Sequence, residues 1–341
     1  MKVLKFGGTS VGSAQRMKEV AKLITDGERK IVVLSAMSGT TNTLVEISDY
    51  LYKKNPEGAN EIINKLESKY RQHIDELFAT PEYKQKGLEL IKSHFDYIRS
   101  YTKDLFTLFE EKVVLAQGEL ISTAMMNYYL QECGVKSVLL PALEYMRTDK
   151  NAEPDPVYIK DKLQVQLELH PDAEIYITQG YICRNAYGEI DNLQRGGSDY
   201  TASLIGAAIN ASEIQIWTDI DGMHNNDPRI VDKTAPVRHL HFEEAAELAY
   251  FGAKILHPTC IQPAKYANIP VRLLNTMDPT APGTLISNDT EKGKIKAVAA
   301  KDNITAIKIK SSRMLLAHGF LRKVFEIFES YQTSIDMICT S

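Results

Sequence analysis

Short runs of apolar residues alternate with amphipathic helical patterns along most of this chain. The runs are four or five residues long and rich in Val, Ile and Leu, as is typical of strands buried on both faces. Between them, apolar residues recur every three or four positions, which is the spacing of one helix face. This alternation predicts an α/β fold, a three-layer αβα sandwich with a largely parallel central sheet. The expected strands are residues 3–6, 31–34, 113–116, 175–178 and 214–218, and the expected helices are residues 13–24, 43–52, 120–131 and 200–209.

One long stretch, residues 54–112, departs from this rhythm. It carries two apolar stripes at helical spacing, and Pro81 lies between them. The pattern predicts an inserted helical hairpin whose helices pack on each other and on the sheet. A cap over a site, or a contact between subunits, is the alternative interpretation of the same stripes.

The C-terminal part of the chain reads as a separate unit. A polar linker is followed by the pattern strand, helix, strand, which is too small to bury both of its own faces. We therefore expect two domains, the second of them only part of a larger domain. The expected bounds are residues 1–294 and 295–341 for the domains, 283–294 for the linker, 305–310 and 335–339 for the strands, and 320–331 for the helix.

Composition narrows the classes of function. The 341 residues include 40 Lys and Arg against 44 Asp and Glu, a net charge of −4 that gives no basic footprint for nucleic acid or an anionic membrane. The four cysteines lie far apart in the sequence, so reduced, buried thiols are expected rather than a zinc or redox pair. His239 and His241 share a strand face but lack a third ligand. No apolar run approaches the roughly 20 residues of a membrane span, and no secretory signal is visible, so we expect a cytoplasmic protein.

Polar or glycine-rich loops follow the predicted strands, where ligands bind in sheets of this kind. In the first loop, Lys5 stands at a strand end before Gly7 and Gly8. Glycine N–H groups and a helix N-terminus can hold a phosphate there, and a lysine can reach the same charge. The sequence is neither a Walker A loop nor G-x-G-x-x-G. A tight turn beside a surface lysine is the alternative.

Two further loops offer polar groups for a small ligand. Residues 35–42 are rich in hydroxyls, which suit a polar ligand and also cap helices. Glu119 is expected at a strand-to-helix junction, where its carboxylate could hold an ammonium group of a substrate or simply complement the helix dipole.

The loop at residues 195–202 is the most specific of the set. Arg195 offers a two-pronged donor for a carboxylate or phosphate, and Asp199 can orient a lysine or a metal-bound water. Residues 217–229 hold aspartates at a strand end, which suit ribose hydroxyls or Mg²⁺ but also turns. Lys254 could contact phosphates or cap a helix C-terminus.

Taken in order, these loops resemble those of the aspartokinases, members of the amino-acid kinase family. The resemblance runs along essentially the whole chain and is carried most specifically by Lys-Phe-Gly-Gly-Thr-Ser and Arg-Gly-Gly-Ser-Asp-Tyr-Thr-Ala. The matching segments are residues 5–10, 35–42, 117–122, 195–202, 217–229 and 252–258. Residues 314–321 and 334–341 resemble the start of the regulatory ACT domain of the lysine-sensitive, single-function type.

The resemblance implies ATP-dependent phosphorylation of the β-carboxylate of L-aspartate, the entry step to lysine, threonine and methionine. It implies Mg²⁺ with ATP, and a homodimer through a full-length ACT region. The implied catalytic residues are Lys5 and Asp199. The implied aspartate-binding residues are Ser35, Thr41, Glu119, Arg195 and Ser198. The implied ATP-binding residues are Lys5, Gly7, Gly8, Thr9, Ser10, Thr218, Asp219, His224, Arg229, Lys254 and Ile255.

The resemblance also implies an effector site in the C-terminal unit. Because that unit supplies one β-α-β pattern and not the paired ACT units of related enzymes, this site is expected to be incomplete and lysine inhibition weak. Ala317 also stands where a serine is usual. The implied effector residues are Met314, Gly319, Phe320, Ser334 and Asp336.

Other functions are compatible with parts of this pattern. They include another amino-acid kinase, acting on glutamate or acetylglutamate, and the kinase part of a bifunctional aspartokinase–homoserine dehydrogenase. A non-catalytic amino-acid sensor is disfavoured because it has no need of Lys5, Arg195 and Asp199 together. A nicotinamide-dependent oxidoreductase is disfavoured because the G-x-G-x-x-G motif is missing.

Overall fold

The computed structural model divides the chain into two compact units, Met1–Ala300 and Lys301–Ser341. It describes all residues except 194–195, 253–255, 290–294, 311–317, 336 and 340–341. The domain boundary expected after residue 294 lies a few residues before this division.

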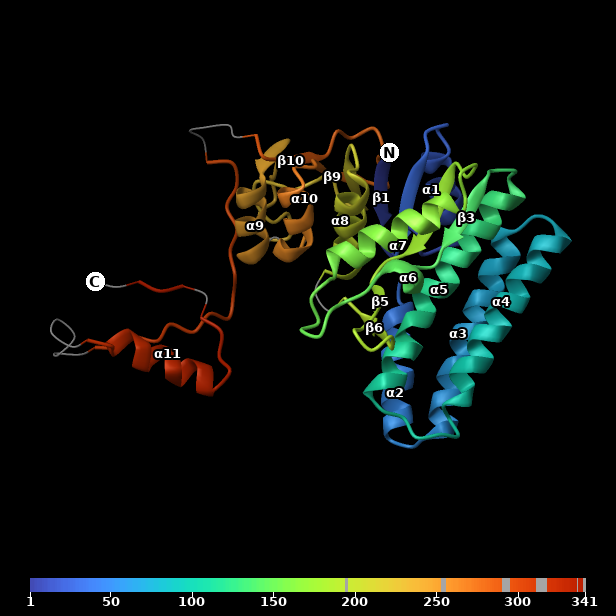
Figure 1. Cartoon of the computed structure of the whole chain (residues 1–341), viewed down its shortest axis with the longest axis horizontal. Helices are drawn as coiled ribbons and strands as arrows, with labels where there is room; N and C mark the ends of the chain where they lie inside the picture. Colours follow the sequence, from blue (N-terminus) through green and yellow to red (C-terminus); the bar gives the residue numbers. More distant parts are fainter. Residues whose placement is uncertain (194–195, 253–255, 290–294, 311–317, 336, 340–341) are drawn as a thin grey trace. The chain divides into compact units, whose positions relative to one another are not determined.

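Eight strands of the first unit form one sheet, in the order β3-β4-β2-β1-β7-β9-β10-β8 (Figure 1). Neighbouring strands are parallel except β9 and β10, which are antiparallel. This confirms the predicted largely parallel sheet. The strands are β1 (Lys2–Phe6), β2 (Lys30–Leu34), β3 (Ser137–Leu140), β4 (Ile175–Gln179), β7 (Ile214–Thr218), β8 (His239–His241), β9 (Val271–Asn275) and β10 (Thr284–Ser287).

Helices cover both faces of the sheet, because alternate residues of its strands belong to two separate hydrophobic cores. In β2, Val32 and Leu34 join one core while Ile31 and Val33 join the other. The first core takes its helical residues from α1 (Ala14–Ile24), α2 (Thr40–Tyr52), α3 (Pro56–Leu77), α4 (Pro81–Ser100) and α5 (Leu108–Glu132). The second takes them from Ala116 of α5 and from α6 (Ala142–Tyr145), α7 (Pro156–Glu168), α8 (Gly197–Ile209), α9 (Phe242–Tyr250), η1 (Pro258–Ile261) and α10 (Gln262–Tyr266). A separate hairpin joins β5 (Ile182–Arg184) and β6 (Ile190–Asn192).

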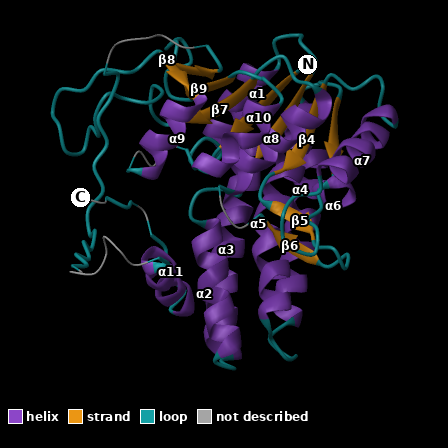
Figure 2. Cartoon of the chain, turned by 60° about the vertical axis from the view of Figure 1, so that its left-hand side comes forward, coloured by secondary structure: helices purple, strands orange, loops and turns teal. Residues whose placement is uncertain are grey.

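The helical hairpin expected within residues 54–112 is present as α3 and α4, which lie beside α2 and α5 (Figure 2). Pro81 opens α4 at its first turn, where a missing N–H costs nothing. The hairpin is shorter than expected, because Leu105 is exposed in a loop and Phe109 belongs to α5.

The strand expected at residues 113–116 is wrong, because these residues lie inside α5. This helix begins with a capping box at Thr107, and every residue from Val113 to Glu119 is buried. A helix buried all round has no polar face, so its apolar run mimics a buried strand. Glu119 therefore lies in the middle of a helix rather than at a strand-to-helix junction, and the interpretation of its carboxylate as a helix-dipole partner fails.

The second unit contains the expected helix as α11 (Phe320–Ser330). The strands expected at residues 305–310 and 335–339 are not formed among the described residues of this unit. A strand needs the hydrogen bonds of a neighbour, and residues 301–310 are exposed. None of the α11 side chains is buried. The assignment of this unit to a partial ACT domain stays a prediction.

The expectation of buried cysteine thiols is met only in part. Cys183 and Cys260 are buried, but Cys133 and Cys339 are exposed. Among the described residues, no helix is both long and apolar enough to cross a membrane.

Candidate active site

The loops expected to carry chemistry meet at the carboxyl edge of the sheet. Parallel register aligns the strand ends, with Phe6 of β1 opposite Leu34 of β2 and Trp217 of β7. Backbone hydrogen bonds then join neighbouring loops: the Ser35 N–H donates to the Phe6 carbonyl at 3.2 Å, and the Gly180 N–H donates to the Leu34 carbonyl at 2.9 Å. The loops therefore share one framework.

Two predicted catalytic residues, Lys5 and Asp199, form an ion pair. Lys5 Nζ lies 2.7 Å from Asp199 Oδ1, and the two side chains are 12% and 16% exposed. Lys5 stands near the end of β1, and Asp199 lies in the first turn of α8, whose positive end favours a carboxylate. Gly196 caps this helix with a φ of +73°, and a Cβ there would lie 1.6 Å from Cys260 Sγ, so the turn requires glycine.

The glycine loop after β1 is held close to the next loop. A Cβ on Gly8 would lie 2.8 Å from the Ala36 carbonyl oxygen, and the Gly8 carbonyl accepts a hydrogen bond from the Ser38 N–H at 3.1 Å. A Cβ on Gly7 would lie 3.5 Å from Lys5 Nζ, so the ammonium group is beside the loop backbone. This arrangement places the Lys5 ammonium group next to backbone amides, and a cation together with N–H donors can bind a phosphate.

The remaining two residues of this loop differ in their exposure. Thr9 is exposed. Ser10 is fully buried, and its hydroxyl shares a 2.7 Å hydrogen bond with the hydroxyl of Thr276, just after β9. Ser10 thus ties the first loop to the end of another strand of the sheet.

A pocket of about 360 Å³ opens beside these loops. Its lining includes five residues expected from the sequence and six that were not singled out as ligand contacts. The lining residues are Gly8, Ser35, Ala36, Met37, Ser38, Gly39, Thr41, Glu119, Tyr181, Gly197 and Ser198.

Hydroxyl groups hold one wall of the pocket together. The Ser35 hydroxyl donates to the Ser198 hydroxyl at 2.9 Å, and the Ser122 hydroxyl donates to the Ser35 carbonyl at 2.8 Å. Ser198 also packs tightly on Gly180, where a Cβ would lie 2.3 Å from the serine Oγ. Two loops that are distant in sequence therefore present their hydroxyls to the same space.

Glu119 is the buried ionisable group of the pocket wall. Its side chain accepts one hydrogen bond, from the Ala36 N–H to Oε1 at 3.2 Å, while Oε2 has no hydrogen-bond partner among the described residues. Burial raises the pKa of Glu119 to about 7, although the backbone hydrogen bond acts in the opposite direction. A buried carboxylate oxygen without a donor attracts a cationic or N–H-bearing ligand.

Tyr181 is a pocket residue that the sequence gave no reason to select. Its φ is +68°, in the left-handed region that residues other than glycine and asparagine rarely adopt. The Tyr181 N–H donates to the Thr201 hydroxyl at 3.0 Å, and the Tyr181 carbonyl accepts from the Leu193 N–H at 2.8 Å. Strain of this kind persists where the surroundings hold it, and it gathers at functional sites.

The residues expected to bind the nucleotide are spread over the loop after β7. The Thr218 hydroxyl accepts from the Ile220 N–H at 3.2 Å, and Asp219 is exposed at the sheet edge. His224 Nδ1 lies 2.8 Å from the Thr234 hydroxyl. Arg229 is exposed and forms an ion pair with Asp227 at 2.5 Å, and its role toward ATP stays a prediction.

Several expected site residues lie outside the described residues or in the second unit. Arg195, Lys254, Ile255, Met314 and Asp336 are not described. Gly319 and Phe320 form the start of α11, and Ser334 is exposed. Within the described ranges no three His, Cys, Asp or Glu side chains gather as metal ligands.

Comparison with known proteins identifies relatives along the whole chain. The amino acid kinase family model matches residues 1–275. Aspartokinase 1, chloroplastic, of Arabidopsis thaliana is 38% identical over 351 residues, covering 99% of this chain and 61% of the relative. The lysine-sensitive aspartokinase 3 of Escherichia coli is 35% identical over 344 residues, covering 99% of this chain and 76% of the relative. The chain therefore spans less than two thirds of the length of its plant relatives.

Solved structures agree with these relatives. The E. coli aspartokinase III, determined in complex with aspartate and ADP in the R-state, superposes with a TM-score of 0.83 at 32% identity, covering 100% of this chain and 76% of that one. The same enzyme in complex with lysine and aspartate in the T-state gives a TM-score of 0.79. On this evidence, the chain belongs to the amino acid kinase family and, within it, to the aspartokinases.

Proposed function

We propose that this protein transfers the γ-phosphoryl group of ATP to the β-carboxylate of L-aspartate, giving 4-phospho-L-aspartate and ADP. The observation that carries the proposal is the pocket itself. It places the Glu119 carboxylate, whose Oε2 has no hydrogen-bond partner among the described residues, beside the Ser35 and Ser198 hydroxyls, at the sheet edge that also carries the Lys5–Asp199 pair. The E. coli relative with this fold was determined with aspartate and ADP bound.

The chemistry fits a pocket whose described lining residues include no histidine. The β-carboxylate of aspartate has an ordinary pKa of about 3.9, so it is already ionised and needs no general base. What the transfer needs is alignment, together with neutralisation of the negative charge on the moving phosphoryl group. A carboxylate oxygen attacks the γ-phosphorus, the bond to the bridging oxygen breaks, and ADP leaves with that electron pair.

Each predicted residue then has a defined task. Lys5 and the amides of Gly7 and Gly8 stabilise the phosphoryl oxygens, and Asp199 orients Lys5. Glu119 accepts the ammonium group of aspartate, which supplies the donor that its Oε2 lacks. The α-carboxylate is assigned to Arg195, outside the described residues, on the resemblance alone.

The nucleotide enters as its Mg²⁺ complex. Mg²⁺ binds phosphates and waters with one or two carboxylates rather than a dedicated protein cage. Thr218, Asp219 and His224 are proposed for the ribose and base.

Three further expectations from the sequence stay predictions. These are the effector site around Gly319 and Ser334, a homodimer of the full-length protein, and a cytoplasmic location. The complex with lysine and aspartate is one of the E. coli enzyme.

The test is ADP release measured with a coupled assay across a panel of amino acids. We expect release with L-aspartate and little with L-glutamate or N-acetyl-L-glutamate. Equal or greater release with glutamate would assign the chain to another amino-acid kinase activity. ATP-independent binding of amino acids with no ADP release would favour the sensor.

A further inference from the structure

The helical hairpin α3–α4 reaches the loop that lines the pocket. The Tyr70 hydroxyl on α3 shares a 2.8 Å hydrogen bond with the Thr40 hydroxyl at the start of α2. Both side chains are buried, at 0% and 1% exposure. Thr40 directly precedes Thr41, a residue of the pocket lining. The insertion thus contacts the pocket framework through a buried polar link.

On its other side, Thr40 packs on the helix that carries Glu119. A Cβ on Gly118 would lie 3.3 Å from Thr40 Cγ2 and 2.8 Å from Ala36 Cβ, so the loop and α5 meet at this glycine. Ala36 is also the residue whose N–H donates to Glu119. A shift of Thr40 would therefore move the loop relative to the Glu119 carboxylate.

A second residue of α3 holds the same loop. Lys69 Nζ donates to the Ser38 carbonyl at 3.1 Å. Between Ser38 and Thr40 lies Gly39, in the left-handed region with a φ of +82°. Two consecutive α3 residues, Lys69 and Tyr70, therefore hold the loop on both sides of Gly39.

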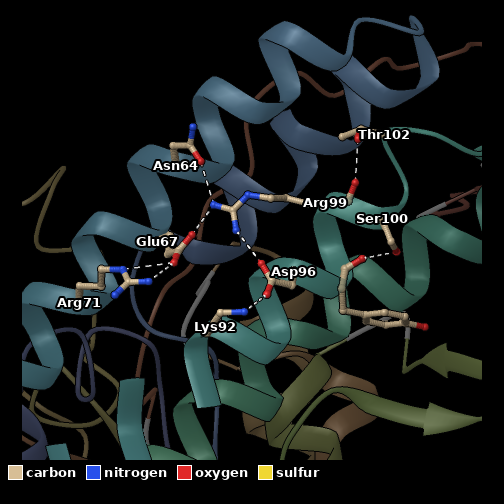
Figure 3. Close-up of polar contacts among 9 residues, drawn as sticks. Asn64, Glu67, Arg71, Lys92, Asp96, Arg99, Ser100 and Thr102 are labelled. Atoms are coloured by element: carbon tan, nitrogen blue, oxygen red, sulfur yellow. Dashed lines mark hydrogen bonds and ion pairs between the residues drawn. The ribbon is translucent and has the colours of Figure 1, made fainter. Parts of the chain in front are cut away.

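The hairpin is itself braced, so it can act as a fixed support. Glu67 on α3 is 8% exposed and pairs with Arg71 at 2.6 Å and with Arg99 of α4 (Figure 3). Arg99 also donates to Asn64 at 2.8 Å and to Asp96 at 3.2 Å. Burial alone would raise the pKa of Glu67, but the hydrogen bonds from Arg99 and Arg71 outweigh it and lower that pKa. The carboxylate therefore stays charged at neutral pH and keeps α3 tied to α4.

Packing places Tyr70 within this brace. The ring of Phe95 on α4 lies against the Tyr70 ring, with centroids 5.7 Å apart. A Cβ on Gly87 of α4 would lie 3.0 Å from both Ile74 and Phe78, so the two helices approach closely there. The Tyr70 ring is enclosed, and its hydroxyl has a fixed position.

We propose that the α3–α4 hairpin positions the aspartate pocket, and that Tyr70 is a positioning residue acting through Thr40. The inference rests on the proposed function, because it assigns the pocket to aspartate. It predicts that loss of the Tyr70 hydroxyl weakens aspartate binding while nucleotide binding and the chemical step are largely retained.

The test compares Tyr70→Phe with a matched control, Tyr145→Phe. Tyr145 on α6 is also fully buried, and its hydroxyl bonds to the Thr178 hydroxyl at 2.6 Å, away from the pocket lining. Tyr70→Phe leaves the buried Thr40 hydroxyl without its partner, so we expect KM for aspartate to rise about tenfold. KM for ATP and kcat should stay within about twofold, and Tyr145→Phe should change none of the three.

A double variant separates positioning from loss of stability. Replacing both partners, in Thr40→Val with Tyr70→Phe, removes the unsatisfied group but does not restore the link, so Tm should return toward the wild-type value while KM for aspartate stays raised. Amide hydrogen exchange in residues 35–43 should speed up both in Tyr70→Phe and in the double variant. If Tyr70→Phe does not fold, the exposed substitution Lys69→Met supplies the same comparison with a smaller rise, about threefold.

The outcomes distinguish the two proposals. Unchanged exchange in residues 35–43 of Tyr70→Phe overturns the positioning role, whatever the substrate. Equal rises in KM for aspartate and ATP overturn it too, since they indicate a general loss of structure. If the wild-type protein shows no aspartate-dependent ADP release, the proposed function fails, and the exchange comparison still decides whether the hairpin positions the loop.

Discussion

Substitution of Glu119 by Gln removes the buried charge that we assign to the ammonium group of aspartate. The side chain is 4% exposed, and its pKa is raised to about 7 because burial disfavours the charged form. The ordinary value is 4.5, so ionising Glu119 in the folded protein costs about 3 kcal/mol. Bound substrate offsets this cost by pairing with the carboxylate.

The consequence for catalysis is a pH dependence in aspartate binding. With a pKa of about 7, roughly one tenth of Glu119 is ionised at pH 6 and nine tenths at pH 8. KM for aspartate should therefore be about tenfold higher at pH 6 than at pH 8, while KM for ATP stays constant. In Glu119→Gln, KM for aspartate should be at least about 30-fold higher than wild type at pH 8, because a charge-assisted bond contributes about 2 kcal/mol. It should also lose its pH dependence.

The raised pKa of Glu119 also predicts how stability depends on pH: ionisation of this group favours aspartate binding but disfavours the folded state. Between pH 4.5 and 7 the folded state holds the Glu119 proton more tightly than the unfolded state, so wild-type stability falls as pH rises through this window. Glu119→Gln has no such cost and should melt several degrees higher than wild type at pH 8, with little difference at pH 5. Glu89→Gln, an exposed substitution on α4, is the control. A wild-type KM for aspartate that is flat from pH 6 to 8, with a less stable Glu119→Gln at pH 8, would refute this reasoning.

Three further substitutions probe the rest of the site. Lys5→Ala should lower kcat about 10²- to 10³-fold through loss of one fixed charge, as measured by steady-state kinetics. Lys2→Ala, at the other end of β1, should retain near-normal kcat. Arg195→Lys keeps the charge but loses the planar fork, so KM for aspartate should rise much more than KM for ATP, and equal changes would remove Arg195 from the aspartate pocket. Gly8→Ala should lower Tm and kcat because its Cβ would lie 2.8 Å from the Ala36 carbonyl oxygen. In Gly7→Ala the Cβ would lie 3.5 Å from its nearest neighbour, so this variant should keep a near-wild-type Tm. Equal Tm values for the two variants would contradict this reasoning.

The sheet could be predicted because its strands are short, aliphatic and bounded by polar loops. In β1 and β2 the local pattern and the tertiary environment agree, since both strands are buried on both faces. The same reasoning failed at residues 113–116, where a helix buried on every side has no polar face to reveal its period. Hydrophobic periodicity indicates which faces of a segment are buried. A strand and a helix that are both buried on all sides therefore give the same pattern.

Site residues could be predicted where the residue type and its immediate sequence neighbours indicate the chemistry. Lys5 stands two residues before Gly7, and Asp199 follows Gly196 and Gly197, and the structure pairs the two side chains. Glu119 was selected for its carboxylate at an expected strand-to-helix junction and then by the resemblance, but its burial in mid-helix and its raised pKa depend on the surrounding fold. Tyr181 could not be predicted, because no local signal places a tyrosine at positive φ. The hydrogen bond between Tyr70 and Thr40 could not be predicted either, because it joins two residues that lie thirty positions apart on separate helices.

The central claim concerns which bond is made, and trapping the product tests it directly. An acyl phosphate reacts with hydroxylamine to give a hydroxamate at the carbon that carried the phosphate. Incubating the wild-type protein with Mg²⁺–ATP, L-aspartate and hydroxylamine should therefore yield the β-hydroxamate of aspartate, in amounts equal to the ADP released. Lys5→Ala, measured in parallel, should give almost none. ADP release without any hydroxamate, or a hydroxamate at the α-carboxyl group, would contradict the assignment of this pocket to β-carboxylate phosphorylation.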